Sequence, residues 1–129
     1  MKGRIAGVLA WGVLALAGPA LAHHSFAMFD ATRLVTLTGS VKEFQYTNPH
    51  SWLQVMIPDA NGQAVEWSFE AEGPSTLLRS GIKKSTLMPG DKVTISFQPM
   101  KDGRPAGKWK SLVKADGTVL YTDGLARTH

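Results

Sequence analysis

The 129-residue sequence contains no cysteine. Disulfide bonds and thiolate metal sites are therefore excluded. The fold must rely on its hydrophobic core, and any metal site must use histidine, methionine, carboxylate or backbone nitrogen ligands. The nucleophile elbow, the glycine-rich phosphate loop and the His-Glu-x-x-His zinc motif are also absent. Because these common catalytic signatures are missing, the sequence gives no support for an enzyme of those classes.

The sequence also lacks an apolar run long enough to span a membrane. The run at residues 5–17 falls short of the ~20 residues that a spanning helix needs. It follows two basic residues, Lys2 and Arg4, and precedes an Ala-Leu-Ala triplet that ends at Ala22. This order is typical of a secretory signal peptide. We predict cleavage after Ala22, a periplasmic location, and no membrane span in the mature chain.

The excess of positive charge is small once this segment is removed. The precursor has 14 basic and 10 acidic residues, so without Lys2 and Arg4 the mature chain has 12 against 10, a net charge of +2. That balance argues against a nucleic-acid partner. The basic residues between positions 101 and 114 would suit an anionic sugar or lipid head group better. Removing 22 of 129 residues leaves 107, residues 23–129, enough for a single domain with a modest core.

Alternating apolar residues predict a chain made mainly of β-strands. The first strand begins at Leu34 and continues to Tyr46. Its apolar parity switches between Val41 and Phe44, which predicts a β-bulge, with Gly39 as a flexible point nearby. Further strands are predicted at residues 52–57, 65–71, 93–97, 109–113 and 119–121.

A helix of one or two turns is expected in the segment GPSTLLRSG, between the third and fourth strands. Pro74 favours its first turn, Ser75 would cap it, and Gly81 would end it. Leu77 and Leu78 are expected to be buried. This order of elements predicts a mainly β fold, a small five- to six-stranded barrel like the oligonucleotide/oligosaccharide-binding (OB) fold. A β-sandwich is the alternative.

The predicted core consists of the alternating apolar residues of successive strands: Val41, Phe44, Leu53, Val55, Trp67, Phe69, Val93, Ile95 and Phe97. Trp52 is an exception among the tryptophans, because it lies beside a turn and off the parity of its apolar neighbours. Glu66, Glu70 and Glu72 share one parity and are expected to form the solvated face of a half-buried strand.

Two segments, HHSFAMFD at residues 23–30 and TNPHSW at residues 47–52, occur together with LTGSV before the second and EGPSTLLRSG…LMPGDKV after it. In combination they resemble a family of small exported bacterial proteins known only as a domain of unknown function. The resemblance covers essentially the whole mature chain. It implies a periplasmic, predominantly β, single-domain protein and brings no reaction with it. One position departs from the family pattern, because Ile82 follows Gly81 where an aromatic residue is expected.

The histidines suggest a metal site. Cleavage after Ala22 would give His23 a free amine, so that its amine and ring nitrogen would chelate one metal ion. His24 adds a ring nitrogen and a backbone amide, and nitrogen-rich sites of this kind suit Cu(II). A third imidazole from His50 would complete a histidine brace if residues 23–30 fold back over the turn that Asn48 and Pro49 predict.

Other interpretations of the same residues stay open. A zinc ion on His23, His24 and His50 would lack a fourth protein ligand and would hold water there. Met28 would serve a softer Cu(I) site, or fill a gap in the core. Alternatively, the paired histidines belong to a solvated terminus, and His50 only pins its turn by a hydrogen bond to a backbone carbonyl. The last residue, His129, is expected to fray.

The sequence thus predicts a periplasmic, non-enzymatic module that binds a small ligand, with Cu(II) as the main hypothesis. The alternative is a metal-free envelope module that holds a protein or a glycan through a strand edge or its lysines. A copper oxidoreductase built on a histidine brace ranks third, because 107 residues leave little room for a substrate platform.

Overall fold

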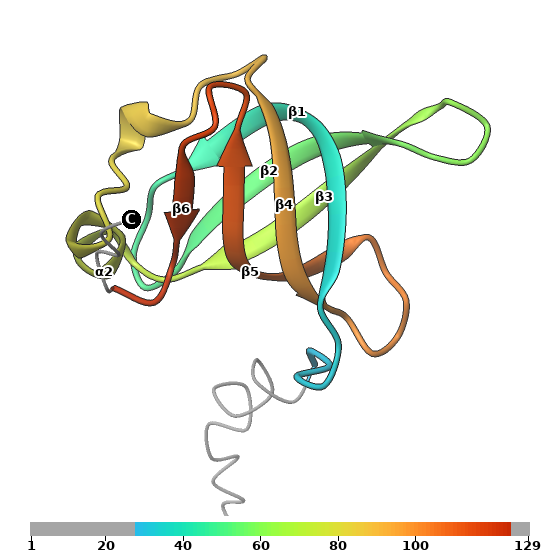
Figure 1. Cartoon of the computed structure of the whole chain (residues 1–129). Coiled ribbons are helices and arrows are strands. Elements are labelled where there is room, and N and C mark those ends of the chain that lie inside the picture. The colour runs from blue at the N-terminus through green and yellow to red at the C-terminus, as the bar shows by residue number, and fades with distance from the viewer. Residues whose placement is uncertain (1–27, 125–129) are drawn as a thin grey trace, which may run out of the picture.

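Six β-strands and one short α-helix form the part of the chain that the computed structural model describes, residues 28–124 (Figure 1). In chain order the elements are β1 (Val35–Gln45), β2 (Ser51–Pro58), β3 (Ala64–Ala71), α2 (Pro74–Arg79), the 3-10 turn η1 (Lys84–Thr86), β4 (Lys92–Pro99), β5 (Ala106–Lys114) and β6 (Val119–Tyr121). Every predicted strand is present, and so is the predicted helix. Within residues 28–124, no helix combines the length and the apolar character that crossing a membrane requires.

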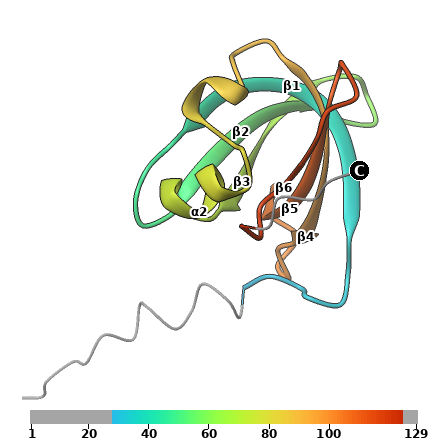
Figure 2. The same cartoon turned by 60° about the vertical axis from the view of Figure 1, so that its left-hand side comes forward.

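The strands close into a barrel. The hydrogen-bonded order is β3-β2-β1-β4-β5, and β5 returns to pair with β3, while β6 extends the sheet as an extra strand beside β5. All pairs are antiparallel except β3 and β5, whose seam is parallel and three residue pairs long. The helix α2 lies between β3 and β4 in sequence and across one end of the barrel (Figure 2). The OB-like prediction is therefore confirmed, and the strands do not form the two facing sheets of a sandwich.

The β-bulge predicted in the first strand is present between Val41 and Glu43. The first half of β1 pairs with β4, and its second half pairs with β2, so one bent strand joins both sides of the barrel. Gly39 lies where these halves meet. A Cβ at this position would clash with the carbonyl oxygen of Met56 on β2, so the close approach of two strands requires glycine here.

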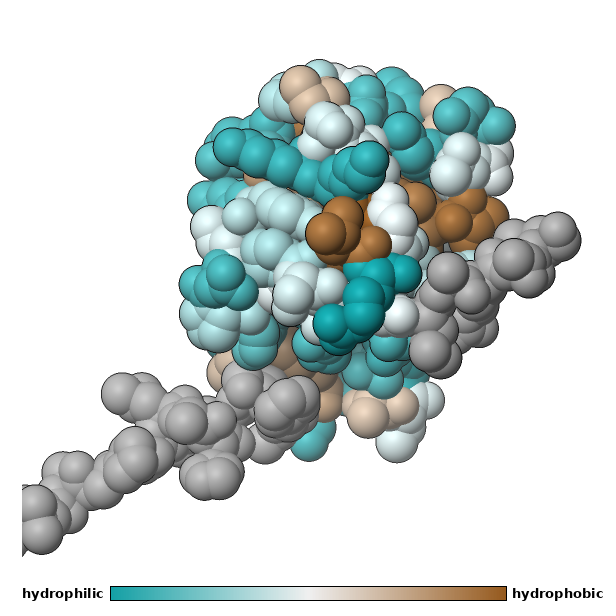
Figure 3. Space-filling view, turned by 90° about the vertical axis from the view of Figure 1, so that its left-hand side faces the viewer, coloured by the Kyte–Doolittle hydropathy of each residue, from teal (hydrophilic) through white to brown (hydrophobic). Residues whose placement is uncertain are grey.

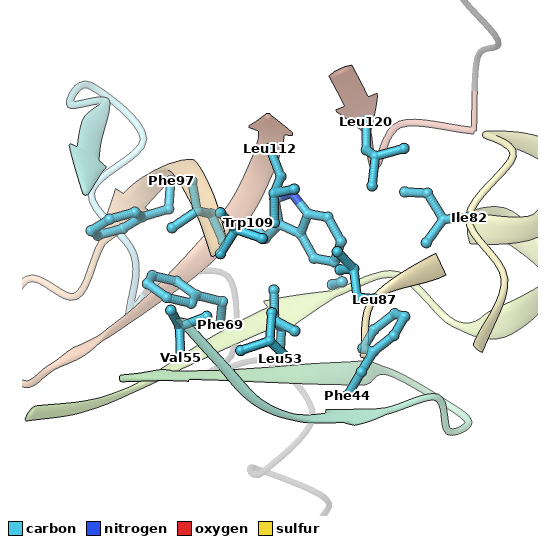
Figure 4. Packing of buried hydrophobic residues seen from close by; sticks show 14 of the residues in the cluster. Phe44, Leu53, Val55, Phe69, Ile82, Leu87, Phe97, Trp109, Leu112 and Leu120 are labelled. Carbon is cyan, nitrogen blue, oxygen red and sulfur yellow. The ribbon is translucent and has the colours of Figure 1, made fainter. Parts of the chain in front are cut away.

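Large side chains from the strands fill the barrel (Figure 4). Trp109 is fully buried at the centre of this view, between a Phe69–Phe97 pair with ring centroids 4.7 Å apart and Phe44, whose ring centroid is 6.1 Å from that of Trp109. Of the nine predicted core residues, eight are buried. Trp67 is only half-buried and packs against the outside of the cluster, stacked on Phe69.

The end of α2 accounts for the burial of Ile82, the residue that follows Gly81. Gly81 has a positive φ of 79°, and its N–H donates to the carbonyl of Leu78, while the N–H of Ile82 donates to the carbonyl of Leu77. This pair of bonds is a Schellman motif, in which the residue after the glycine makes an apolar contact with the last turn. Ile82 and Leu77 are accordingly both fully buried.

Two details of the predicted helix are wrong. The residue at the N-cap is Gly73, and it makes no side-chain capping bond, so Ser75 does not cap the helix. Leu78 is 55% exposed, because a helix this short presents only one face to the barrel and Leu77 occupies it. The predicted stop at Gly81 is confirmed.

Candidate functional site

His50 faces a buried carboxylate. It lies at the end of the turn between β1 and β2, and its Nδ1 is in contact with Oε1 of Glu70, near the end of β3. The side chain of His50 is 33% exposed, whereas Glu70 is only 3% exposed. The alternative in which His50 binds only a backbone carbonyl is therefore wrong: its ring is held by a carboxylate.

The turn that carries His50 is fixed by hydrogen bonds between residues close in sequence. The hydroxyl of Thr47 donates to the carbonyl oxygen of His50 at 2.8 Å, and the fully buried Ser51 accepts from the backbone N–H of Thr47 at 3.3 Å. The Asn48–Pro49 peptide bond is cis. These contacts confirm the predicted turn and set the direction in which the imidazole leaves the backbone.

The same turn covers the end of β3, which accounts for the burial of Glu70. The backbone N–H of Ser51 donates to the carbonyl of Glu72 at 3.2 Å. A Cβ at Gly73 would lie 2.7 Å from the carbonyl oxygen of Pro49, so the turn packs directly on the backbone there. The prediction that all three glutamates are solvated is thus wrong for Glu70 and right for Glu66, which is exposed and pairs with Lys42.

A row of side chains continues the site around the outside of the barrel. Strand register places Gln45, Trp52, Glu70, Lys108 and Gln98 next to one another on β1, β2, β3, β5 and β4. Residues in register on neighbouring strands project to the same side of the sheet. Trp52, off the parity of its buried neighbours as the sequence indicates, is therefore one wall beside Glu70, and Lys108 is the other.

The charges of this site suit a cation. Lys108 has a side chain only 15% exposed, and its Nζ lies 3.3 Å from Oε1 of Glu72. The two carboxylates of Glu70 and Glu72 thus lie beside one ammonium and one imidazole. Carboxylate oxygens and an imidazole nitrogen are groups that interact favourably with cationic ligands.

Glu70 also determines which ring nitrogen of His50 is available. An ionised carboxylate can only accept hydrogen bonds, so Nδ1 carries the proton that it shares with Glu70. In the neutral ring, the lone pair is then on Nε2, which has no partner among residues 28–124. Such an imidazole can ligate a metal ion, accept a hydrogen bond or take up a proton.

The structure brings only one of the predicted metal ligands into view. His23 and His24 lie outside the described residues, as do the predicted signal peptide, its cleavage site and His129. Across residues 28–124, no group of three histidine, aspartate or glutamate side chains is arranged to hold a metal ion. Met28 is 37% exposed and is the first described residue.

The anchor of the described N-terminus is close to the β4–β5 loop. Phe29 forms a bridge with Met100, and the N–H of Asp30 donates to the carbonyl of Pro99 at 2.8 Å. The N–H of Lys101 donates to the carbonyl of Met28 at 2.9 Å. Phe29 therefore lies beside Met100, two residues beyond Gln98 in the row described above, and Met28 lies beside Lys101.

A family of unknown function, DUF6152, matches residues 10–110. The chain belongs to DUF6152. The match includes β1 to β4, residues 106–110 of β5, and the complete His50–Glu70 site, so the DUF6152 region contains most of the barrel together with its candidate site. No curated protein and no solved structure matches the chain.

Proposed function

We propose that this protein is an exported, periplasmic, non-enzymatic binding module whose ligand is Cu(II). The metal would be bound by Nε2 of His50 together with the amine and ring of His23 and the nitrogens of His24, once a signal peptide has been cleaved after Ala22. The observation that carries the proposal is the imidazole of His50, held through Nδ1 by the buried Glu70, while Nε2 has no partner among residues 28–124.

The buried carboxylate supports metal binding at His50. Histidines that ligate metal ions usually donate their second ring N–H to a carboxylate or carbonyl, which fixes the tautomer and raises the basicity of the ligating nitrogen. The contact between His50 and Glu70 has this form. Nitrogen-rich ligand sets favour Cu(II) among the first-row divalent ions.

The distances permit the N-terminal histidines to reach His50. The path from Glu70 to Phe29 crosses three strand spacings: from Glu70 to Lys108, from Lys108 to Gln98, and from Met100 to Phe29. It also runs two residues along β4, from Gln98 to Met100. With spacings of ~4.8 Å and ~3.3 Å, these steps span roughly 16 Å. Met28 is held one residue further along by Lys101, and the five residue steps from Met28 back to His23 cover about 17 Å when extended, so the histidine side chains supply the rest of the reach.

Copper titration of protein that begins at His23 tests the proposal. We expect one Cu(II) per chain, with nitrogen hyperfine coupling in electron paramagnetic resonance spectra. Binding should weaken as the pH falls through about 6, because coordinating imidazoles and amines must lose their protons. His50→Ala and His23→Ala should both weaken it, and His129→Ala is the matched control that should not.

Adding one residue at the N-terminus distinguishes a histidine brace, which uses the terminal amine as a ligand, from a histidine site that does not. One alanine ahead of His23 leaves every side chain in place and moves only the amine. Affinity should then fall markedly, and Glu70→Gln should lower it by about 10- to 100-fold, as for other outer-shell partners of metal ligands. If the extended protein binds Cu(II) as tightly as the protein starting at His23, the amine is not a ligand. If His50→Ala has no effect, the proposal fails.

A further inference from the structure

The last residues of β1 have a neighbouring strand on one side only. On the β2 side, pairing continues through Gln45, but on the β4 side it ends near Val41, whose backbone groups bond with Gly90 and Asp91 at 2.8 and 2.9 Å. Backbone groups alternate in direction along an antiparallel strand, and the bulge adds one residue to this alternation. The N–H and C=O of Phe44 therefore point to the open side, like those of Val41.

A groove separates this open edge from the segment that precedes β4. Residues 83–89, which include η1, run opposite the end of β1 (Figure 2), and within residues 28–124 they make no backbone hydrogen bond with it. The groove between them has a volume of about 590 Å³. Phe44, Leu87, Met88 and Pro89 give it an apolar lining, and Met88 is 52% exposed.

The charges around the groove are mainly positive. Lys83 and Lys84 both line it, and neither forms an ion pair with any residue of the described chain. Glu43 is the one acidic residue of the lining. Apolar atoms also emerge between hydrophilic ones on the side of the molecule that carries α2 (Figure 3). An apolar groove with lysines that lack an ion-pair partner in the described chain complements a ligand that is both apolar and anionic.

We propose that this groove binds an extended, acidic peptide segment of a partner protein, which adds a strand to the open edge of β1. Such β-augmentation combines backbone hydrogen bonds with pockets for alternate side chains. Here the backbone of Phe44 provides the hydrogen bonds, the exposed side chains of Met88 and Pro89 receive apolar side chains, and Lys83 and Lys84 receive carboxylates. A fatty acid would satisfy the apolar surface and the lysines but not the backbone groups of Phe44.

This site is independent of the proposed copper site. The groove shares no lining residue with the row around His50 and Glu70. Peptide binding should therefore be the same with and without Cu(II), and failure of either proposal leaves the other unaffected.

A capped hexapeptide of alternating glutamate and valine is a suitable probe. Added to the isotope-labelled protein from His23 to His129, it should shift the amide resonances of Phe44 and Met88 saturably in nuclear magnetic resonance spectra. The same peptide N-methylated at alternate residues keeps its side chains but loses backbone donors, so its affinity should fall about tenfold or more. Equal binding of the two peptides would overturn strand addition.

Charge-reversal variants test the lysines. Lys83→Glu/Lys84→Glu should weaken peptide binding by about tenfold at low salt, and by less at high salt. Lys101→Glu/Lys110→Glu, with the same change in net charge at exposed positions outside the groove, is the matched control and should retain binding. Met88→Ser, at an exposed position, tests the apolar wall without disturbing the core.

Three results would contradict the proposal. The first is the absence of saturable shifts at the groove. The second is binding of dodecanoate, but not of the peptide, which would identify a lipid-like ligand. The third is a concentration-dependent shift of the same resonances without any peptide, which would identify a second copy of this chain as the occupant.

Discussion

At the scale of single residues, Glu70 is the side chain that the sequence describes least well. Its alternation with apolar neighbours places it on the outer face of β3, and the structure agrees, since its register partners Trp52 and Lys108 belong to that face. It is nevertheless buried, because a turn from another part of the chain covers it. Alternation reports which face a residue occupies and says nothing about what later covers that face.

Removing Glu70 should be more costly than removing its neighbour on the same face. Glu70→Ala leaves the imidazole of His50 without its buried carboxylate partner and should lower the free energy of unfolding by about 1–3 kcal/mol. Glu66→Ala breaks an exposed pair with Lys42 and should change it by less than ~1 kcal/mol. Urea unfolding at constant pH measures both. Equal losses for the two variants would show that the pair with His50 adds no stability.

At the scale of elements, several turns use the same local device. Asp30, Asp102 and Asp116 each accept a hydrogen bond from the backbone N–H two residues further on, at 3.0, 3.1 and 2.9 Å. These bonds close Asx turns, which the Asp-Gly of the predicted last hairpin already indicates. Hydrogen bonds to the ionised form hold the pKa of each carboxyl below its ordinary value of 3.8.

The hairpin between β5 and β6 should accordingly lose stability in acid. The side-chain hydroxyl of Thr118, and then its backbone N–H, lower the pKa of Asp116. The contribution of the Asp116 carboxylate to the stability of the folded chain is therefore present above pH 3.8 and is lost as the pH falls through its lower, folded-state pKa. Thr118→Val should raise the pKa of Asp116 toward 3.8, measured by carboxyl-carbon resonance titration. Thr32→Val, the control, should change Asp30 instead, and an unchanged Asp116 in Thr118→Val would contradict the assignment.

At the scale of the whole molecule, the strands of the fold could be predicted because each is marked by a pattern of neighbouring residues. Alternation located each strand, and the parity switch after Val41 located the bulge. Closure of the barrel by the parallel seam could not be derived this way, because it pairs residues far apart in sequence. The Trp52–Glu70 pair was within reach, since a hairpin turning at Asn61 sets residue 52 opposite residue 70. His50 over Glu70 was not, because it depends on how the turn before β2 bends.

The barrel should unfold as one unit whose stability depends on position in the core. Phe97 is fully buried, so Phe97→Ala should cost about 3–5 kcal/mol, the usual range for a truncated core aromatic. Trp67→Ala should cost less, because Trp67 is half-buried at the edge of the cluster. Thermal and chemical unfolding followed by circular dichroism measure both. A loss below ~1 kcal/mol for Phe97→Ala would mean that the inward face of β4 is misassigned.

The parallel seam has a mechanical consequence for whatever His50 binds. Opening the barrel between β3 and β5 breaks three residue pairs, whereas separating β1 from β4 breaks six. Local unfolding begins where the fewest contacts hold a fold together, so the barrel opens most readily at the seam between β3 and β5. Glu70 and Lys108 form the last residue pair of that seam. In the proposed copper site, a metal ion would be bound by His50 on the β3 side and by the N-terminal histidines, which precede the anchor of the chain on β4. The metal ion would then connect the two sides of this seam, so that opening of the seam and release of the metal would be coupled.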